Sequence, residues 1–111
     1  MATNWKELVK GATLTGTAAS VYTTPVATQT TIQAASATNA TGAPITVAIY
    51  VVPSGEAFDA KYRVALCNVP AGGVSTPWQA INHKLEPGAQ IYADGNGANL
   101  TISGAEYLPN T

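Results

Sequence analysis

The sequence predicts an all-β protein, a single antiparallel β-sandwich of jelly-roll type with about eight short strands and a short N-terminal arm. Short runs alternate apolar with polar residues, and clusters of Gly, Pro, Asn and Asp separate these runs at regular intervals. The length of 111 residues suits one sandwich. We therefore expect an arm at residues 1–11 and the sandwich at residues 12–111. A closed barrel is the alternative, because similar strands and turns can build one.

The strongest predicted strand covers residues 45–52, where every odd position is apolar, so it belongs near the centre of a sheet. The last strand is predicted at residues 98–107, with Leu100 and Ile102 facing inward. Residues 94–97, Asp-Gly-Asn-Gly, form the clearest hairpin signal because they tolerate positive φ angles. The remaining strands are expected at residues 12–15, 20–23, 30–38, 61–69 and 89–93, with an edge strand within 74–81.

Residues 4–10 are the one helix-like piece, because Trp5, Leu8 and Val9 are spaced to share a helix face and Gly11 would end the helix. A helix this short is not stable alone, so it must dock on another surface. We weigh two possibilities equally. The segment either grips a partner or folds back on its own sandwich.

Charged residues make up 10% of the chain, well below the usual quarter. Charge is depleted at the centres of protein interfaces, so this composition favours a module held by other proteins. A plain secreted β domain fits the composition equally well. The net charge is −1, and the five basic residues are scattered, so no basic stripe exists for phosphate contacts. We expect no nucleic-acid binding.

The first residues contain no basic region followed by an apolar one, so no signal peptide is visible. No apolar run approaches the roughly 18 residues that a membrane span needs. We therefore expect synthesis in a cytoplasm and no membrane partner. Cys67 is the one cysteine, which excludes an intrachain disulfide, and its apolar neighbours predict a buried, inert thiol.

The side chains that carry chemistry are too few to predict a catalytic, metal or cofactor site. A zinc site needs three or four His or Cys ligands, and the chain offers only His83 and Cys67. His83 lies beside a predicted turn and is expected to be a solvated loop residue. Glu56 and Asp59 could form a carboxylate pair or a loose calcium loop, but a solvated connection between strands is the favoured interpretation. We expect no enzyme activity and no cofactor.

The aromatic residues offer an alternative function, because two Trp, five Tyr and one Phe could line a sugar-binding face. Packing in the core and at its rim is the favoured interpretation. Trp78 follows Pro77 at a predicted sheet edge and is the best candidate for an exposed ring. The residues predicted to bind a partner are Trp5, Leu8, Val9 and Trp78.

Several phrases between about residues 12 and 107 give the chain a recognisable order of strands and turns. They are Val21-Tyr22-Thr23-Thr24-Pro25, Thr31-Ile32-Gln33-Ala34-Ala35, the run from Ile45 to Gly55 after Asn39-Ala40-Thr41, Leu85-Glu86-Pro87-Gly88-Ala89, and Leu100 to Glu106. In this order they resemble small β-sandwich virion proteins of tailed bacteriophages, which include capsid decoration (cement) proteins, head fibres, and tail or collar components. The segment Trp5 to Leu8 lies outside the resemblance.

The resemblance implies a structural protein of the virion. The favoured role is a capsid decoration protein that binds the major capsid protein on the outside of the head and bridges neighbouring subunits. It also implies a symmetric homo-oligomer, with a homotrimer expected. A tail, collar or fibre-base component is the first alternative, and a carbohydrate-binding β-sandwich module is the second.

Overall fold

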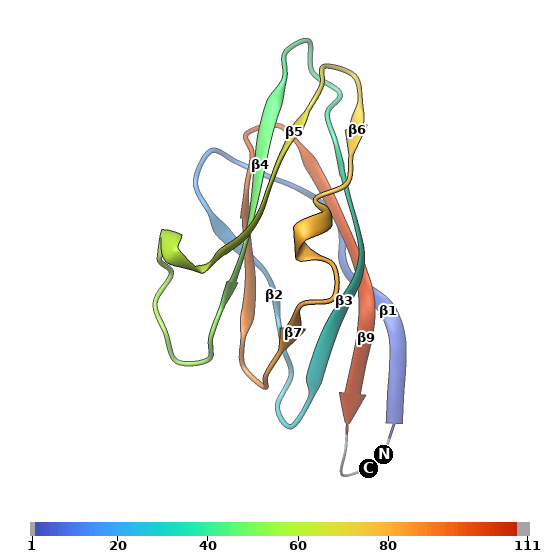
Figure 1. Ribbon diagram of the computed structural model, residues 1–111, viewed down its shortest axis with the longest axis vertical. Helices are drawn as coiled ribbons and strands as arrows, with labels where there is room; N and C mark the ends of the chain where they lie inside the picture. Colours follow the sequence, from blue (N-terminus) through green and yellow to red (C-terminus); the bar gives the residue numbers. More distant parts are fainter. Residues whose placement is uncertain (1, 109–111) are drawn as a thin grey trace.

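The computed structural model describes residues 2–108, which form nine strands in two antiparallel sheets packed face to face (Figure 1). The strands are β1 (Ala2–Thr13), β2 (Ala19–Thr23), β3 (Gln29–Thr38), β4 (Ile45–Val52), β5 (Arg63–Val69), β6 (Val74–Ser75), β7 (Lys84–Leu85), β8 (Gln90–Asp94) and β9 (Asn99–Leu108). Two single 3₁₀ turns, η1 (Ala60–Tyr62) and η2 (Trp78–Ala80), lie in the connections. The predicted β-sandwich is confirmed.

The strands pair in a nested way along the chain. Sheet A has the order β1-β9-β3-β6 with β7 also beside β3, and sheet B has the order β2-β8-β4-β5. Thus β4 pairs with β5, β3 with β6 and β7, β2 with β8, and β1 with β9. This rolled hairpin, divided between two sheets, is the jelly-roll arrangement. The described strands number nine and not eight because β7 forms a separate short pair with β3.

The core lies between the two sheets and is built by alternate residues of the inner strands. Its fully buried large side chains are Ile32, Val47, Ile49, Val69, Leu85, Ile91, Leu100 and Ile102. Burying a side chain of this size contributes about 1.5–3 kcal/mol. β4 lies between β8 and β5 with the predicted bounds, so its central position is confirmed. Leu100 and Ile102 face inward, also as predicted.

The expectation of a helix at residues 4–10 is wrong, because this segment belongs to β1 and pairs with β9 in sheet A. The spacing of Leu8 and Val9 suits a helix face, but a β-bulge between Glu7 and Val9 also lets both neighbours turn inward. Both side chains join the core of their own sandwich. Residues 2–11 are therefore part of the sheet and form no separate arm.

The expected hairpin at residues 94–97 is also wrong, because this turn connects β8 of sheet B to β9 of sheet A. The turn chemistry itself was predicted correctly, since Gly97 has a φ of 93°. The N–H of Gly95 donates to the carbonyl oxygen of Thr15 at 2.9 Å, and that of Gly97 to Leu14 at 3.0 Å. Turn residues set the local backbone, whereas the sheet that the next strand joins is set by packing.

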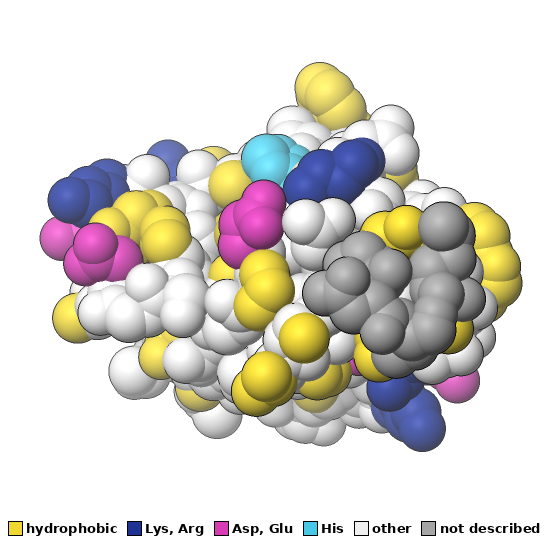
Figure 2. All heavy atoms as spheres, turned by 90° about the horizontal axis from the view of Figure 1, so that it is seen from below, with side chains coloured by type: hydrophobic (Ala, Val, Ile, Leu, Met, Phe, Trp, Pro, Cys, Tyr) yellow, Lys and Arg dark blue, Asp and Glu magenta, His cyan; other side chains and the backbone are white. Residues whose placement is uncertain are grey.

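The molecule is elongated, with principal extents of 48 × 27 × 19 Å. Ala2 pairs with Leu108, so both ends of the described chain lie at the lower end of the long axis in Figure 1. On the face drawn in Figure 2, the few charged side chains are scattered among uncharged ones, and apolar side chains reach the surface in several places. The face drawn there therefore carries few charged groups.

Candidate functional site

The four residues predicted to bind a partner divide into two pairs. Trp5 and Trp78 are each 68% exposed, as a partner-binding side chain must be. Leu8 and Val9 are only 8% and 3% exposed, because they pack into the core of their own sandwich. They are therefore not available to a partner, which corrects the expectation from the sequence.

Trp78 is one of three exposed apolar side chains carried by β5, β6 and η2, the elements where the edges of the two sheets lie close together. β5 is an edge strand of sheet B and β6 of sheet A, and β5 contacts both β6 and η2. Leu66 on β5, Val74 on β6 and Trp78 on η2 are 44%, 63% and 68% exposed. We call these three residues the β5–β6 surface. The predicted edge strand within residues 74–81 is confirmed as β6.

The turn around Trp78 explains why its indole points outward. Pro77 and Ala80 are both buried, which fixes the two ends of the 3₁₀ turn against the sandwich. The N–H of Trp78 donates to the carbonyl oxygen of Thr76 at 2.8 Å, and Ile81 donates to Trp78 at 3.1 Å. With its neighbours held inward, the remaining direction for the indole is toward solvent.

A buried polar network joins the two sheets near the lower end of the molecule. Glu106 on β9 is only 6% exposed, and one of its carboxylate oxygens accepts a hydrogen bond of 2.5 Å from the Tyr22 hydroxyl on β2. The Tyr22 hydroxyl also lies 2.9 Å from Thr30 Oγ1 on β3. Lys6 Nζ, on β1, is 3.5 Å from the other carboxylate oxygen. The network therefore links side chains from four strands of both sheets, with Tyr22 and Lys6 contacting the carboxylate and Thr30 contacting Tyr22.

The electrostatics of this network favour a structural role. Burial, followed by the hydrogen bond to Glu106, raises the pKa of Tyr22 far above its ordinary value. The hydroxyl therefore stays protonated and remains a donor to the carboxylate, whose charge Lys6 balances. No local pattern in the sequence predicts this network, because Tyr22 and Glu106 are 84 residues apart.

Aromatic rings cover part of the outer face of sheet B. Phe58, from the connection after β4, packs edge-on against Tyr50 with ring centroids 4.8 Å apart and stacks on Tyr92 at 5.1 Å. The Tyr50 hydroxyl donates to Asp94 at 2.8 Å. These rings contact one another, which is the packing role that the sequence favoured for most aromatics.

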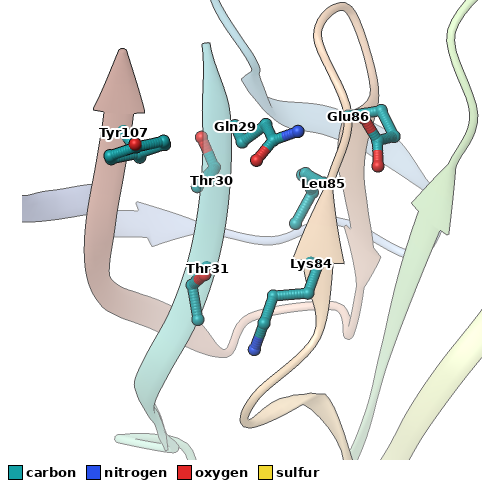
Figure 3. A pocket seen from close by; sticks show the side chains of 7 residues that line it. All are labelled: Gln29, Thr30, Thr31, Lys84, Leu85, Glu86 and Tyr107. Carbon is teal, nitrogen blue, oxygen red and sulfur yellow. The ribbon is translucent and has the colours of Figure 1, made fainter. Parts of the chain in front are cut away.

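A hollow of about 360 Å³ is lined by residues of β3, β7, the turn after β7, and β9 (Figure 3). Its lining residues are Gln29, Thr30, Thr31, Lys84, Leu85, Glu86 and Tyr107. In Figure 3 the Gln29 side chain extends from β3 toward β7, and the Lys84 side chain extends from β7 toward β3. The Lys84 ammonium donates to the carbonyl oxygen of Asn82 at 3.0 Å, so it makes a hydrogen bond within its own loop. The lining therefore combines hydroxyl, amide and charged side chains with the apolar Leu85.

The residues weighed for metal binding or catalysis are dispersed. Asp59 caps η1 by accepting the N–H of Lys61 at 3.0 Å. Cys67 is half-buried, and burial raises the pKa of its thiol. Within residues 2–108 no three His, Cys, Asp or Glu side chains lie close enough together to hold a metal ion.

Comparison with known proteins gives no match: no family model, no curated protein and no solved structure is similar to this chain. Over residues 2–108, no helix is long and apolar enough to cross a membrane.

Proposed function

We propose that this chain is a non-enzymatic structural protein of a bacteriophage virion, and specifically a capsid decoration protein. The observation that carries the role in protein binding is the exposure of large apolar side chains at the β5–β6 surface in a chain with only 10% charged residues. Exposed apolar side chains of this size, with little charge around them, are typical of surfaces that bind protein.

Trp78 is the proposed anchor, because buried aromatic side chains dominate the energetics of most protein interfaces. Val74 and Leu66 would add apolar area beside it. Fully burying an apolar side chain contributes about 1.5–3 kcal/mol, so these residues can supply a useful affinity before any polar contact is counted. Each bound copy would bridge neighbouring subunits of the major capsid protein and so resist expansion of the head.

The jelly roll is consistent with this role but does not select it, because viral capsid and lectin domains share the architecture. The assignment to a phage rests on the ordered strand and turn phrases of the sequence. A homotrimer on the head surface and a location in the virion are parts of the same proposal.

The test is labelling of purified particles of the phage that encodes the chain, with gold-conjugated antibody against it. Label over the whole head supports decoration, whereas label at one vertex or along the tail supports the tail, collar or fibre-base alternative. Unlabelled particles, or a gene without virion genes beside it, would refute both.

Binding of purified protein to heads that lack it tests the β5–β6 surface. We expect Trp78→Ala to weaken binding at least about tenfold, the effect of losing an interface anchor. Val26→Ala is the control, because Val26 is 90% exposed and lies in the β2–β3 turn. Equal binding of both variants would contradict the assignment of this surface.

A carbohydrate-binding module is the second candidate, favoured by the exposed indole of Trp78, since such a ring can stack on a sugar face. It predicts saturable binding on a glycan array that Trp78→Ala abolishes. If no glycan on the array binds, the carbohydrate-binding function is refuted, and the proposal of a virion protein is unaffected.

A further inference from the structure

The outer side of β1 is a free sheet edge. β1 is the terminal strand of sheet A, and within residues 2–108 it pairs only with β9. The backbone N–H and C=O groups on its other side have no strand partner there. Such an edge can accept another strand unless bulges, proline or charge protect it.

Only one half of this edge is protected against pairing with another strand. Register shifts between Glu7 and Val9 and between Val9 and Ala12 distort the second half, which also carries Lys10. The first half, Ala2–Glu7, pairs residue by residue with β9 without interruption. The Lys6 side chain within it is 46% exposed, but its ammonium lies 3.5 Å from Glu106 of the same chain, so Glu7 is the one charged residue of this half without an ion pair within residues 2–108. We call Ala2–Glu7 the open segment.

We propose that the open segment pairs antiparallel with the open segment of a second copy, about a two-fold axis at Trp5, to give one sheet that runs through both molecules. The proposal concerns the free protein and does not depend on a role in a virion. A two-fold contact makes dimers, so for the free protein this proposal is the alternative to the homotrimer proposed above for the head surface, and the oligomeric state in solution distinguishes the two.

The side chains of the open segment determine where the axis can lie. A two-fold axis perpendicular to the sheet keeps like faces together, and directly opposite residues in an antiparallel pair share a face. An axis at Lys6 would place two lysines opposite each other, which is unfavourable. An axis at Asn4 would leave Glu7 outside the pair.

An axis at Trp5 avoids both problems. It places Trp5 opposite its symmetry mate and Thr3 opposite Glu7 of the second copy, with no like charges in contact. Trp5 lies opposite Ala105, on the outer face of the sheet, and is 68% exposed in a single copy. Pairing would cover both indoles, and directly opposite aromatic side chains stabilise strand pairs.

Sedimentation velocity of the full chain over a concentration series tests the contact. We expect wild-type protein to dimerise and Trp5→Lys to be monomeric, because two lysines then meet at the axis. Trp78→Lys is the matched control, since Trp78 is equally exposed but lies at the opposite sheet edge, and it should dimerise like wild type.

Two substitutions at Thr3, which is exposed in the single copy, test the register. Thr3→Lys faces Glu7 of the second copy and should strengthen dimerisation, whereas Thr3→Glu should weaken it. Two cross-strand charge pairs change per dimer, so each shift in the dissociation constant should be on the order of two- to thirtyfold. Wild-type protein that stays monomeric, a trimer that Trp5→Lys leaves intact, or equal effects of both Thr3 variants would overturn the proposal.

Discussion

At Gly104 the two inner strands of sheet A come too close together for any side chain. A Cβ atom there would overlap the backbone carbonyl oxygen of Thr31 and lie 3.0 Å from Leu8 Cδ1. We expect Gly104→Ala to lower the free energy of unfolding by about 3 kcal/mol, measured by urea denaturation, because backbone must move. Gly42→Ala is the control, since its Cβ would meet nothing within 4 Å. It should change stability by no more than about 0.5 kcal/mol, and equal losses would contradict the steric argument.

Tyr22 should make the stability of the fold sensitive to alkaline pH. Its pKa is raised in the folded state, so the stabilisation is complete below the ordinary value of 10.0 and is lost as the pH rises above it. Tyr22→Phe removes the donor to Glu106 and should cost about 1.5–3 kcal/mol at neutral pH. Urea unfolding from about pH 8 to about pH 11 should show a smaller alkaline loss in Tyr22→Phe than in wild type. Tyr50 and Cys67, whose pKa values are also raised, contribute equally in both proteins, so identical alkaline losses would exclude the proposed role of Tyr22.

Strand β1, residues 2–13, is part of the folding unit. Leu8 packs in the core, so we expect Leu8→Ala to lower the free energy of unfolding by about 2–4 kcal/mol in urea denaturation. Trp5→Ala, three residues earlier and largely exposed, should cost less than about 1 kcal/mol in the monomer. A detachable arm would give small effects at both positions. Deletion of residues 2–10 should prevent folding for the same reason.

The elements differ in how far the sequence could predict them. β4 was predictable to the residue because its alternation is local and both faces of the strand are covered. β1 was not, because the spacing of Leu8 and Val9 fits a helix face and a bulged strand equally well. Pairing with β9, at the other end of the chain, decides between them. The candidate site was also predictable only in part. Pro77 indicated the sheet edge at which Trp78 is exposed, but no local sequence pattern predicts the contact between Tyr22 and Glu106.

At the scale of the whole molecule, the sandwich presents two different edges to its surroundings. The β1 edge offers a regular strand with one exposed indole, and the opposite edge offers the β5–β6 surface. One edge can therefore serve contacts between copies while the other remains accessible to a partner. Assembly through edges leaves the packed core unchanged, which suits a module that is stable before it binds.

The sparse charge of the molecule leads to a prediction about how it binds. Five basic and six acidic residues give a net charge of −1, and the three side chains of the β5–β6 surface are uncharged. Binding through that surface should depend mainly on apolar burial, which moderate NaCl does not screen. We expect the dissociation constant for phage heads to change by less than about threefold between about 50 mM and about 500 mM NaCl, measured by co-sedimentation. A loss of tenfold or more would show that charged contacts, and therefore a different surface, hold the protein to its partner.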